Sequence, residues 1–152
     1  MTYDQEILED ILRSGCTQLL EEQPMLFDQN ADINERTVAG ELSAIISPKF
    51  DGLHTNCEYN RMTDENGIQI PKRIGLNPNN INPSRVFPDI IVHRQEDRDH
   101  NLLIIEIKMS WKNSRKDDDL AKLQKYLEEL RYQYGLYLEL GANGIEDMQW
   151  FQ

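Results

Sequence analysis

Two nearly continuous apolar runs, VFPDIIVH (86–93) and NLLIIEIK (101–108), constrain the fold of this chain most strongly. Both are rich in β-branched residues, and their continuous apolar character predicts strands that are covered on both faces. The charged segment RQEDRD between them predicts a turn. Asp89, Glu106 and Lys108 interrupt these runs, and burying a charge is costly unless it is paired or bound to a metal. These three charges therefore call for a functional explanation.

The rest of the chain supplies helices and further strands around these two runs. In order, the patterns predict an amphipathic helix over 3–20, a helix from about Asn34 to Ser47, a strand over 53–62, a long loop over 63–85 with a short extended piece at 68–70, a helix over 117–131, a strand over 134–140, and a turn from Gly141 to Gly144 into a short final segment that is a candidate trailing strand. This order predicts the α/β class, with a single mixed β-sheet flanked by helices in one domain over 1–152.

The charge of the chain is strongly negative, with 16 Lys and Arg against 27 Asp and Glu and a formal net charge of −11. This balance argues against a protein that coats nucleic acid by bulk electrostatics. The negative charge is uneven, however. Residues 1–32 form an acidic extension with eight acids and one base, whereas residues 49–116 hold eleven bases and nine acids. The segment with the interrupted strands is thus slightly basic, so the overall charge does not exclude an enzyme that acts on nucleic acid.

The charged residues of the second run share one face of their strand. Positions two apart on a strand point the same way, so Glu106 and Lys108 should lie together. Two carboxylates and an ammonium near strand ends predict a site for a hard divalent cation such as Mg²⁺ or Mn²⁺, which prefers oxygen ligands. The alternative is an ion pair of Glu106 with Lys108 at the edge of the sheet, on a solvated face.

The motif consists of Pro88-Asp89, sixteen intervening residues, and Glu106-Ile107-Lys108. With its place on the second and third strands of an α-β-β-β-α-β order, it closely resembles the motif of the PD-(D/E)XK nuclease superfamily. The resemblance covers residues 34–140. It implies a restriction-endonuclease-like core, to which the N-terminal helix is an addition.

The resemblance also implies a role for each motif residue. Asp89 and Glu106 would ligate Mg²⁺ or Mn²⁺, with the backbone carbonyl of Ile107 as a further ligand, and Lys108 would position and activate the attacking water. The implied function is a metal-dependent nuclease that hydrolyses phosphodiester bonds, with DNA as the more expected substrate than RNA. The alternative is a catalytically silent nuclease-fold module that binds a protein or nucleic-acid partner.

Related nucleases often add an acidic residue from the helix before the first strand, and two glutamates are candidates here. On a helical projection Glu35 falls about 20° from Leu42, inside the apolar stripe, whereas Glu41 lies about 100° away. Glu35 is therefore the predicted further metal ligand, and Glu41 is the reserve. Against this, Asp32 and Glu35 have the spacing of a capping box with Asp32 as the N-cap. Glu58, on the predicted first strand, is a weaker candidate.

Several bases could follow a phosphate backbone near this site. They are Arg61, Lys72, Arg73, Arg85, Lys112, Arg115, Lys116 and Lys122. The acidic N-terminal helix is a candidate surface for a basic protein partner, and Trp150 with Phe151 is a candidate homodimer contact. Tyr126 is expected to be a core or rim residue.

The remaining features indicate an intracellular protein. Cys16 and Cys57 cannot form a disulfide framework, so a reducing cytoplasm is the expected compartment. The acidic N-terminus has no signal-peptide pattern, and the longest strongly apolar stretch, LLII at 102–105, is too short to span a membrane. His93 and His100 flank the predicted turn and are expected to be solvated.

Overall fold

A five-stranded mixed β-sheet flanked by helices forms the structure, which confirms the predicted α/β class. The computed structural model describes residues 2–57, 62–63, 69–70, 73–74, 84–85, 88–95 and 100–152. The helices are α1 (Gln5–Glu22), α2 (Glu35–Ile46) and α3 (Lys116–Leu130), with short 3₁₀ helices at Pro24–Phe27, Ser47–Lys49 and Ser110–Lys112. The sheet contains β1 (His54–Cys57), β6 (Ile90–His93), β7 (Leu103–Met109), β8 (Tyr134–Gly141) and β9 (Gly144–Phe151).

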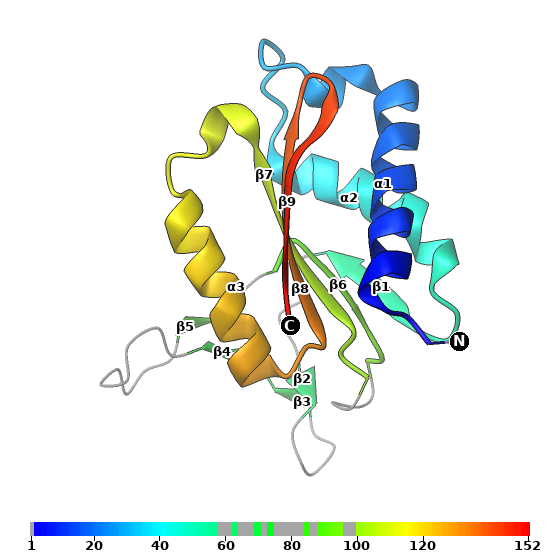
Figure 1. Ribbon diagram of the computed structural model, residues 1–152, viewed down its shortest axis with the longest axis vertical. Coiled ribbons are helices and arrows are strands. Elements are labelled where there is room, and N and C mark those ends of the chain that lie inside the picture. The colour runs from blue at the N-terminus through cyan, green and yellow to red at the C-terminus, as the bar shows by residue number, and fades with distance from the viewer. Residues whose placement is uncertain are drawn as a thin grey trace.

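The strand order places the two apolar runs in the middle of the sheet. The order is β1-β6-β7-β8-β9, with β7 and β8 parallel and the other neighbours antiparallel. The parallel connection from β7 to β8 passes through α3 (Figure 1). Every residue of β6 is buried, and so are all residues of β7 except Lys108, as expected for strands covered on both faces. β7 is therefore the central strand of the sheet.

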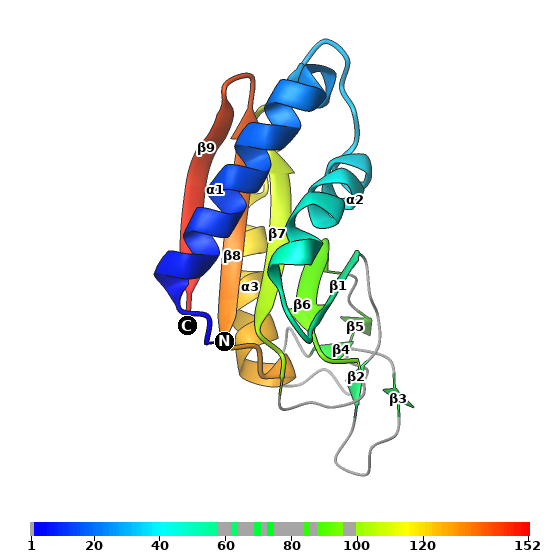
Figure 2. The ribbon, with the colours of Figure 1, turned by 90° about the vertical axis from the view of Figure 1, so that its right-hand side faces the viewer.

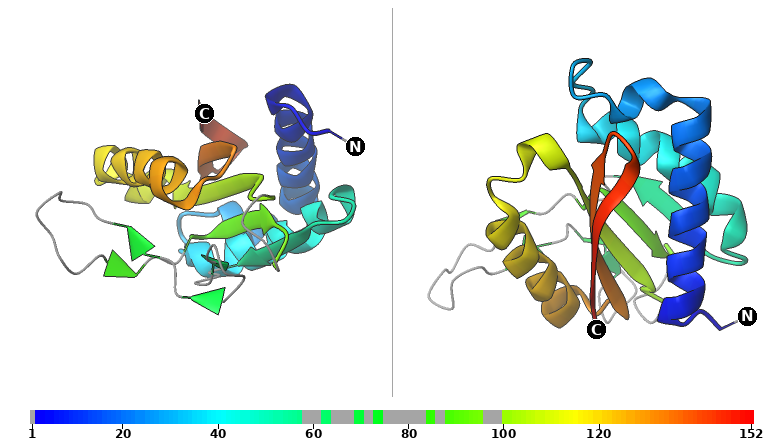
Figure 3. Two further views of the ribbon diagram at one scale, coloured as in Figure 1. Left: turned by 90° about the horizontal axis from the view of Figure 1, so that it is seen from below. Right: turned by 45° about the horizontal axis from the view of Figure 1, so that its top comes forward.

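Helices cover the two faces of the sheet unequally. α1 and α2 pack on one face, and α3 covers the other (Figure 2). Alternate residues of β7 sort between these layers, with Ile105 and Ile107 in the larger core under α1 and α2, and Ile104 in the smaller core under α3. Figure 3 shows the sheet lying between α1 and α3. Within the described residues, no helix is both long and apolar enough to cross a membrane.

The first two helices begin and end close to the predicted positions. The Asp4 side chain caps α1 by accepting a hydrogen bond from the Ile7 amide. The N-cap of α2 is Asn34, whose side chain accepts from the Thr37 amide at 3.0 Å. The capping-box interpretation is therefore wrong, because Asp32 lies before the helix with a left-handed φ of 49°.

The segment from 53 to 85 departs most from the prediction. β1 covers His54–Cys57 of the strand predicted over 53–62, and residues 58–61 of that prediction lie outside the described residues. Within the predicted loop, β2 (Met62–Thr63) pairs with β3 (Gln69–Ile70), and β4 (Arg73–Ile74) pairs with β5 (Ser84–Arg85). The extended piece predicted at 68–70 corresponds to β3. β4 lies beside α3 (Figure 1).

The C-terminal segment is a full strand of eight residues, longer than the short trailing segment predicted. β9 pairs with β8 through the predicted turn, and the register shifts at Glu139 and Leu140. Trp150 donates a hydrogen bond to Glu9 of α1 at 2.9 Å, and its ring packs edge-on against Tyr134. This pairing ties the end of the chain to its first helix.

The prediction that His93 is solvated is wrong. His93 is 3 % exposed, and its Nε2 lies 2.8 Å from the Asn56 side-chain oxygen on β1. The antiparallel register pairs His93 with His54, which is exposed at the start of β1. His93 therefore belongs to the packed contact between β1 and β6.

A buried carboxylate at Glu139 holds the start of α3 against β8 and β9. Glu139 is 6 % exposed, and it accepts hydrogen bonds from the Tyr137 hydroxyl at 2.7 Å and from the Asn113 amide at 3.4 Å. The Lys116 ammonium lies 3.8 Å from Glu139 and 2.6 Å from Asp147. Its hydrogen bond holds the pKa of Asp147 below the ordinary value. The carboxylate is thus buried with polar partners, as its charge requires.

Replacing Tyr137 by Phe should destabilise the protein by about 1–3 kcal/mol, because Glu139 then loses its shortest hydrogen bond. Urea unfolding monitored by circular dichroism measures the change. The matched control is Tyr134→Phe on the same strand, since the Tyr134 hydroxyl makes no hydrogen bond among the described residues. The control should change the free energy of unfolding by less than about 0.5 kcal/mol. Equal effects of the two substitutions would contradict this role of Glu139.

Candidate metal-binding site between two helices

The three motif residues come together around the C-terminal half of β7. Glu106 and Lys108 lie on the face of β7 that α3 covers, as their spacing predicts. Asp89 lies just before β6, the neighbouring strand, and its Oδ2 accepts a hydrogen bond from the Ile107 amide at 2.7 Å. This bond fixes Asp89 beside β7, the strand that carries both Glu106 and Lys108. The site is therefore built on the central pair of strands.

Glu106 is buried and incompletely hydrogen-bonded. The residue is 9 % exposed, and its Oε1 is inaccessible and has no hydrogen-bond partner in the described part of the chain. The hydroxyl of Tyr126, from α3, interacts electrostatically with Glu106 but completes no hydrogen bond of good geometry. A buried carboxylate oxygen without a donor is costly in a folded protein. An oxygen of this kind is suited to binding a cation.

The two carboxyl groups shift each other's titration. Burial raises the pKa of Asp89 to about 6, while the hydrogen bond from Ile107 and the interaction with Glu106 oppose the shift. Burial also raises the pKa of Glu106 well above its ordinary value, and the charge of Asp89 raises it further. The positive charge of Lys122 partly offsets both shifts. Ionising both carboxyl groups is unfavourable because they are close together and desolvated. A divalent cation bound between them would offset that cost.

Lys108 is held by α3 and not by Glu106. Its ammonium lies 3.1 Å from Asp119 Oδ2, and both side chains are largely buried, at 23 % and 17 % exposed. The strand that carries Glu106 and Lys108 is central and covered, so the alternative of a solvated ion pair at the sheet edge is wrong.

Glu35 lies on the other side of Asp89, at the first turn of α2. Its charge raises the pKa of Asp89, and Asn34, Glu35, Arg36 and Asp89 line one open pocket. The Met109 amide lies 3.5 Å from Glu35 Oε1, at the limit of a hydrogen bond. Glu41 is exposed and instead accepts a hydrogen bond from Gln23. Of the two predicted candidates, α2 therefore brings Glu35 to Asp89.

The carboxylates do not form a closed three-ligand cluster. Among the residues that the structure describes, no group of three or more His, Cys, Asp or Glu side chains is arranged to hold a metal. Asp89 and Glu106 nevertheless provide two carboxylates, and the free oxygen of Glu106 lacks a donor. Mg²⁺ is commonly held by one or two carboxylates together with waters and substrate phosphates. The residues present thus fit a hydrated divalent cation with few protein ligands.

Of the four predicted phosphate-binding bases whose side chains the structure describes, three contact acids. These three follow β7, and each contacts a carboxylate. The pairs are Lys112 with Asp32 at 2.9 Å, Arg115 with Asp118 at 3.6 Å, and Lys116 with Asp147 at 2.6 Å. Lys122 lines a cleft along α3 with Arg115 and Lys125, near the carboxylates. Glu58, Arg61 and Lys72 lie outside the described residues, and so do the side chains of Arg73 and Arg85.

Sequence reasoning did not identify Asp119 and Tyr126 as neighbours of the site. Three consecutive acids, Asp117 to Asp119, are explained equally well by the dipole at the start of a helix. The helical spacing could have identified Asp119, because it places this residue on the same face of α3 as the buried Leu123 and Tyr126. The same argument, that an acidic residue lies within the apolar stripe of its helix, selected Glu35.

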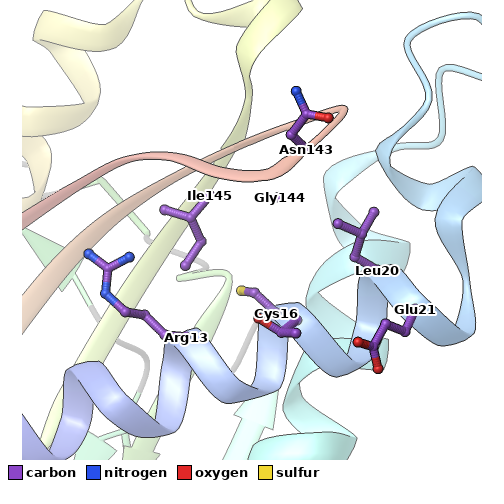
Figure 4. A pocket seen from close by; sticks show the side chains of 8 residues that line it. Arg13, Cys16, Leu20, Glu21, Asn143, Gly144 and Ile145 are labelled. Carbon is purple, nitrogen blue, oxygen red and sulfur yellow. The ribbon is translucent and has the colours of Figure 1, made fainter.

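A separate pocket of about 430 Å³ lies between α1 and the turn from β8 to β9 (Figure 4). Arg13, Leu20 and Ile145 contribute to its lining, and none of the predicted site residues does. The thiol of Cys16 lies in this region, and burial raises its pKa to about 12. A thiol that remains protonated is a poor nucleophile, so this pocket shows no comparable reactive group.

Comparison with protein-family models, curated proteins and solved structures finds no match for this chain.

The raised pKa of Asp89 predicts how stability depends on pH without metal. A folded-state pKa above the unfolded value means that the native state binds more protons, so this contribution to stability declines as pH rises from about 4 through 6. In EDTA, Asp89→Asn should therefore be more stable than the parent at pH 8, by on the order of 2 kcal/mol, with little difference at pH 4.

Denaturant unfolding at both pH values measures this difference. Glu41→Gln is the matched control, because Glu41 is exposed on α2 and should leave the difference near zero at both pH values. A loss of stability in Asp89→Asn at pH 8 would contradict the prediction.

Proposed function

We propose that this chain is a divalent-metal-dependent nuclease of the PD-(D/E)XK type, which hydrolyses phosphodiester bonds with DNA as its substrate. The observation that carries the proposal is a pair of neighbouring carboxyl groups, Glu106 buried on β7 and Asp89 half-buried just before β6, with Lys108 on the same face of β7 as Glu106. The order of elements also supports it: helix α2 is followed by β1, β6, β7, α3 and β8. The inserted β2 to β5 and the added α1 and β9 lie outside that order.

The chemistry follows from the positions of the side chains. Asp89, Glu106 and the Ile107 carbonyl would hold Mg²⁺ or Mn²⁺, which when bound supplies a water of lowered pKa and neutralises charge on the phosphate. Lys108 would donate hydrogen bonds to a phosphate oxygen and to the attacking water. Lys122 adds a second positive charge beside the carboxylates, and Glu35 adds an acceptor for metal-bound water. Oxygen ligands for a cation and an ammonium donor for a phosphate thus come from the same face of β7, which supports the proposal.

A second candidate function is a silent module with the same fold that binds a partner. It is favoured by the state of the surface bases, since Lys112, Arg115 and Lys116 already contact carboxylates. Phosphates would have to compete with those acids, which weakens binding of nucleic acid. The acidic N-terminal helix would then provide a surface for a basic protein. Metal binding and cleavage distinguish the two candidates.

Cleavage is tested with the purified full chain, Mg²⁺ or Mn²⁺, and labelled substrates of supercoiled DNA, single-stranded DNA and RNA. We expect metal-dependent nicking or degradation of DNA. Asp89→Asn and Lys108→Met should each reduce the rate by at least about 100-fold, because each removes a group that stabilises the transition state.

The matched control for these variants is Glu41→Gln, which changes an exposed carboxylate on α2 and should cleave at the parental rate. Cleavage that persists in both Asp89→Asn and Lys108→Met would point to a contaminating enzyme and overturn the assignment. Absence of cleavage together with absence of metal binding would favour the silent module.

Metal binding is measured separately by isothermal titration calorimetry with Mn²⁺. We expect one site in the parent, and binding at pH 8 should be tighter than at pH 5, since the raised pKa values of Asp89 and Glu106 mean that metal must displace protons. Glu106→Gln should abolish binding. Glu35→Gln should weaken it about 3- to 10-fold, whereas Glu41→Gln should leave it unchanged. Equal effects at Glu35 and Glu41 would rule out Glu35 as part of the site.

A further inference from the structure

Asp119 is the one acidic side chain that the structure places in ion-pair contact with Lys108 among the described residues. Its Oδ2 lies 3.1 Å from the ammonium, and this oxygen is inaccessible to solvent with no hydrogen-bond donor of good geometry. Asp119 comes from the first turn of α3, whereas Lys108 stands near the end of β7. The contact therefore joins two elements of the site across the smaller core. An ion pair in such surroundings is screened less than one on the surface.

The first turn of α3, which carries Asp119, is itself fastened to the sheet. Lys116 contacts Asp147 at 2.6 Å and approaches Glu139 at 3.8 Å. Its ammonium also lies 5.3 Å from the centre of the Tyr137 ring. Leu123 and Tyr126, one and two turns further along, are fully buried against the same face. The backbone at Asp119 is thus held in place from both directions along the helix.

We propose that Asp119 is a positioning residue that holds the Lys108 ammonium beside the carboxylate pair. The inference rests on the proposed nuclease function and names the residue on which the orientation of Lys108 depends. A lysine has four rotatable bonds and three donors, so a single fixed acceptor removes much of its freedom and leaves two donors for water and phosphate. Asp119 touches neither the phosphate position nor a metal ligand directly, and it acts through Lys108.

The test compares Asp119→Asn with Asp117→Asn in the full chain. Asp117 lies in the same first turn but is exposed, so it is a matched control for charge and helix position. Steady-state cleavage should show kcat lowered about 10- to 100-fold in Asp119→Asn with KM within twofold, because orientation and not substrate binding is lost. Asp119→Glu, which keeps the carboxylate, should restore part of kcat. Asp117→Asn should match the parent.

A second readout does not depend on activity. Lysine acylation by an activated ester, followed by peptide mass spectrometry, should be roughly fivefold faster at Lys108 in Asp119→Asn than in the parent, since the ammonium has lost its partner. Acylation at Lys125, which is more exposed and pairs with Glu128, should not change and serves as the internal control. Circular dichroism of each variant confirms that the fold is retained.

The outcomes separate the two proposals. Unchanged Lys108 acylation in Asp119→Asn overturns the positioning role, whether or not the parent cleaves DNA. A higher kcat in Asp119→Asn also overturns it, because Asp119 would then restrain Lys108 and not position it. If Lys108 acylation is faster in Asp119→Asn but the parent neither binds Mn²⁺ nor cleaves, the ion pair is established, and the nuclease function and the catalytic role of Asp119 are both overturned.

Discussion

Two neighbouring carboxyl groups at an apolar sheet, Glu106 buried within it and Asp89 half-buried beside it, are the constraint on which the rest of this structure depends. Glu106 occupies the middle of the central strand between the apolar residues Ile105 and Ile107, and Asp89 stands beside it through its hydrogen bond with Ile107. Such a pair is unfavourable when both groups are ionised. Lys122 and the hydroxyl of Tyr126, both from α3, favour the ionised form of Glu106, and the Ile107 amide favours that of Asp89. The composition of α3 is therefore tied to the residues of β7.

The two faces of the sheet differ in composition, and only one of them carries the charged groups of the site. The face under α1 and α2 holds the larger apolar core, which contains most of the buried hydrophobic residues. The face under α3 combines a smaller core with the carboxylates, Lys108 and the contacts of Glu139. A face with polar groups contributes less free energy of folding per unit of buried area than an apolar one. The larger core under α1 and α2 therefore offsets the cost of the charges on the face under α3.

The sequence was sufficient to predict the fold class, the central strands and the grouping of Asp89, Glu106 and Lys108. A charge within a β-branched run is costly to bury, so such a residue indicates a specific partner or ligand. It also favoured Glu35 over Glu41 through helical periodicity. It did not predict the partner of Lys108, since Asp119 comes from another element and meets it only through tertiary packing. The burial of His93 was missed for the same reason: the register with β1, and not the local pattern, decides its surroundings.

The ion pairs of Lys112, Arg115 and Lys116 have a consequence for how the protein would respond to salt. A base that already contacts a carboxylate carries its own internal counterion. When such a base turns to a phosphate, the nucleic acid releases a condensed cation, but the abandoned carboxylate attracts one from solution. The two exchanges nearly cancel. The affinity for nucleic acid would therefore depend on salt concentration less steeply than the number of contacting bases implies.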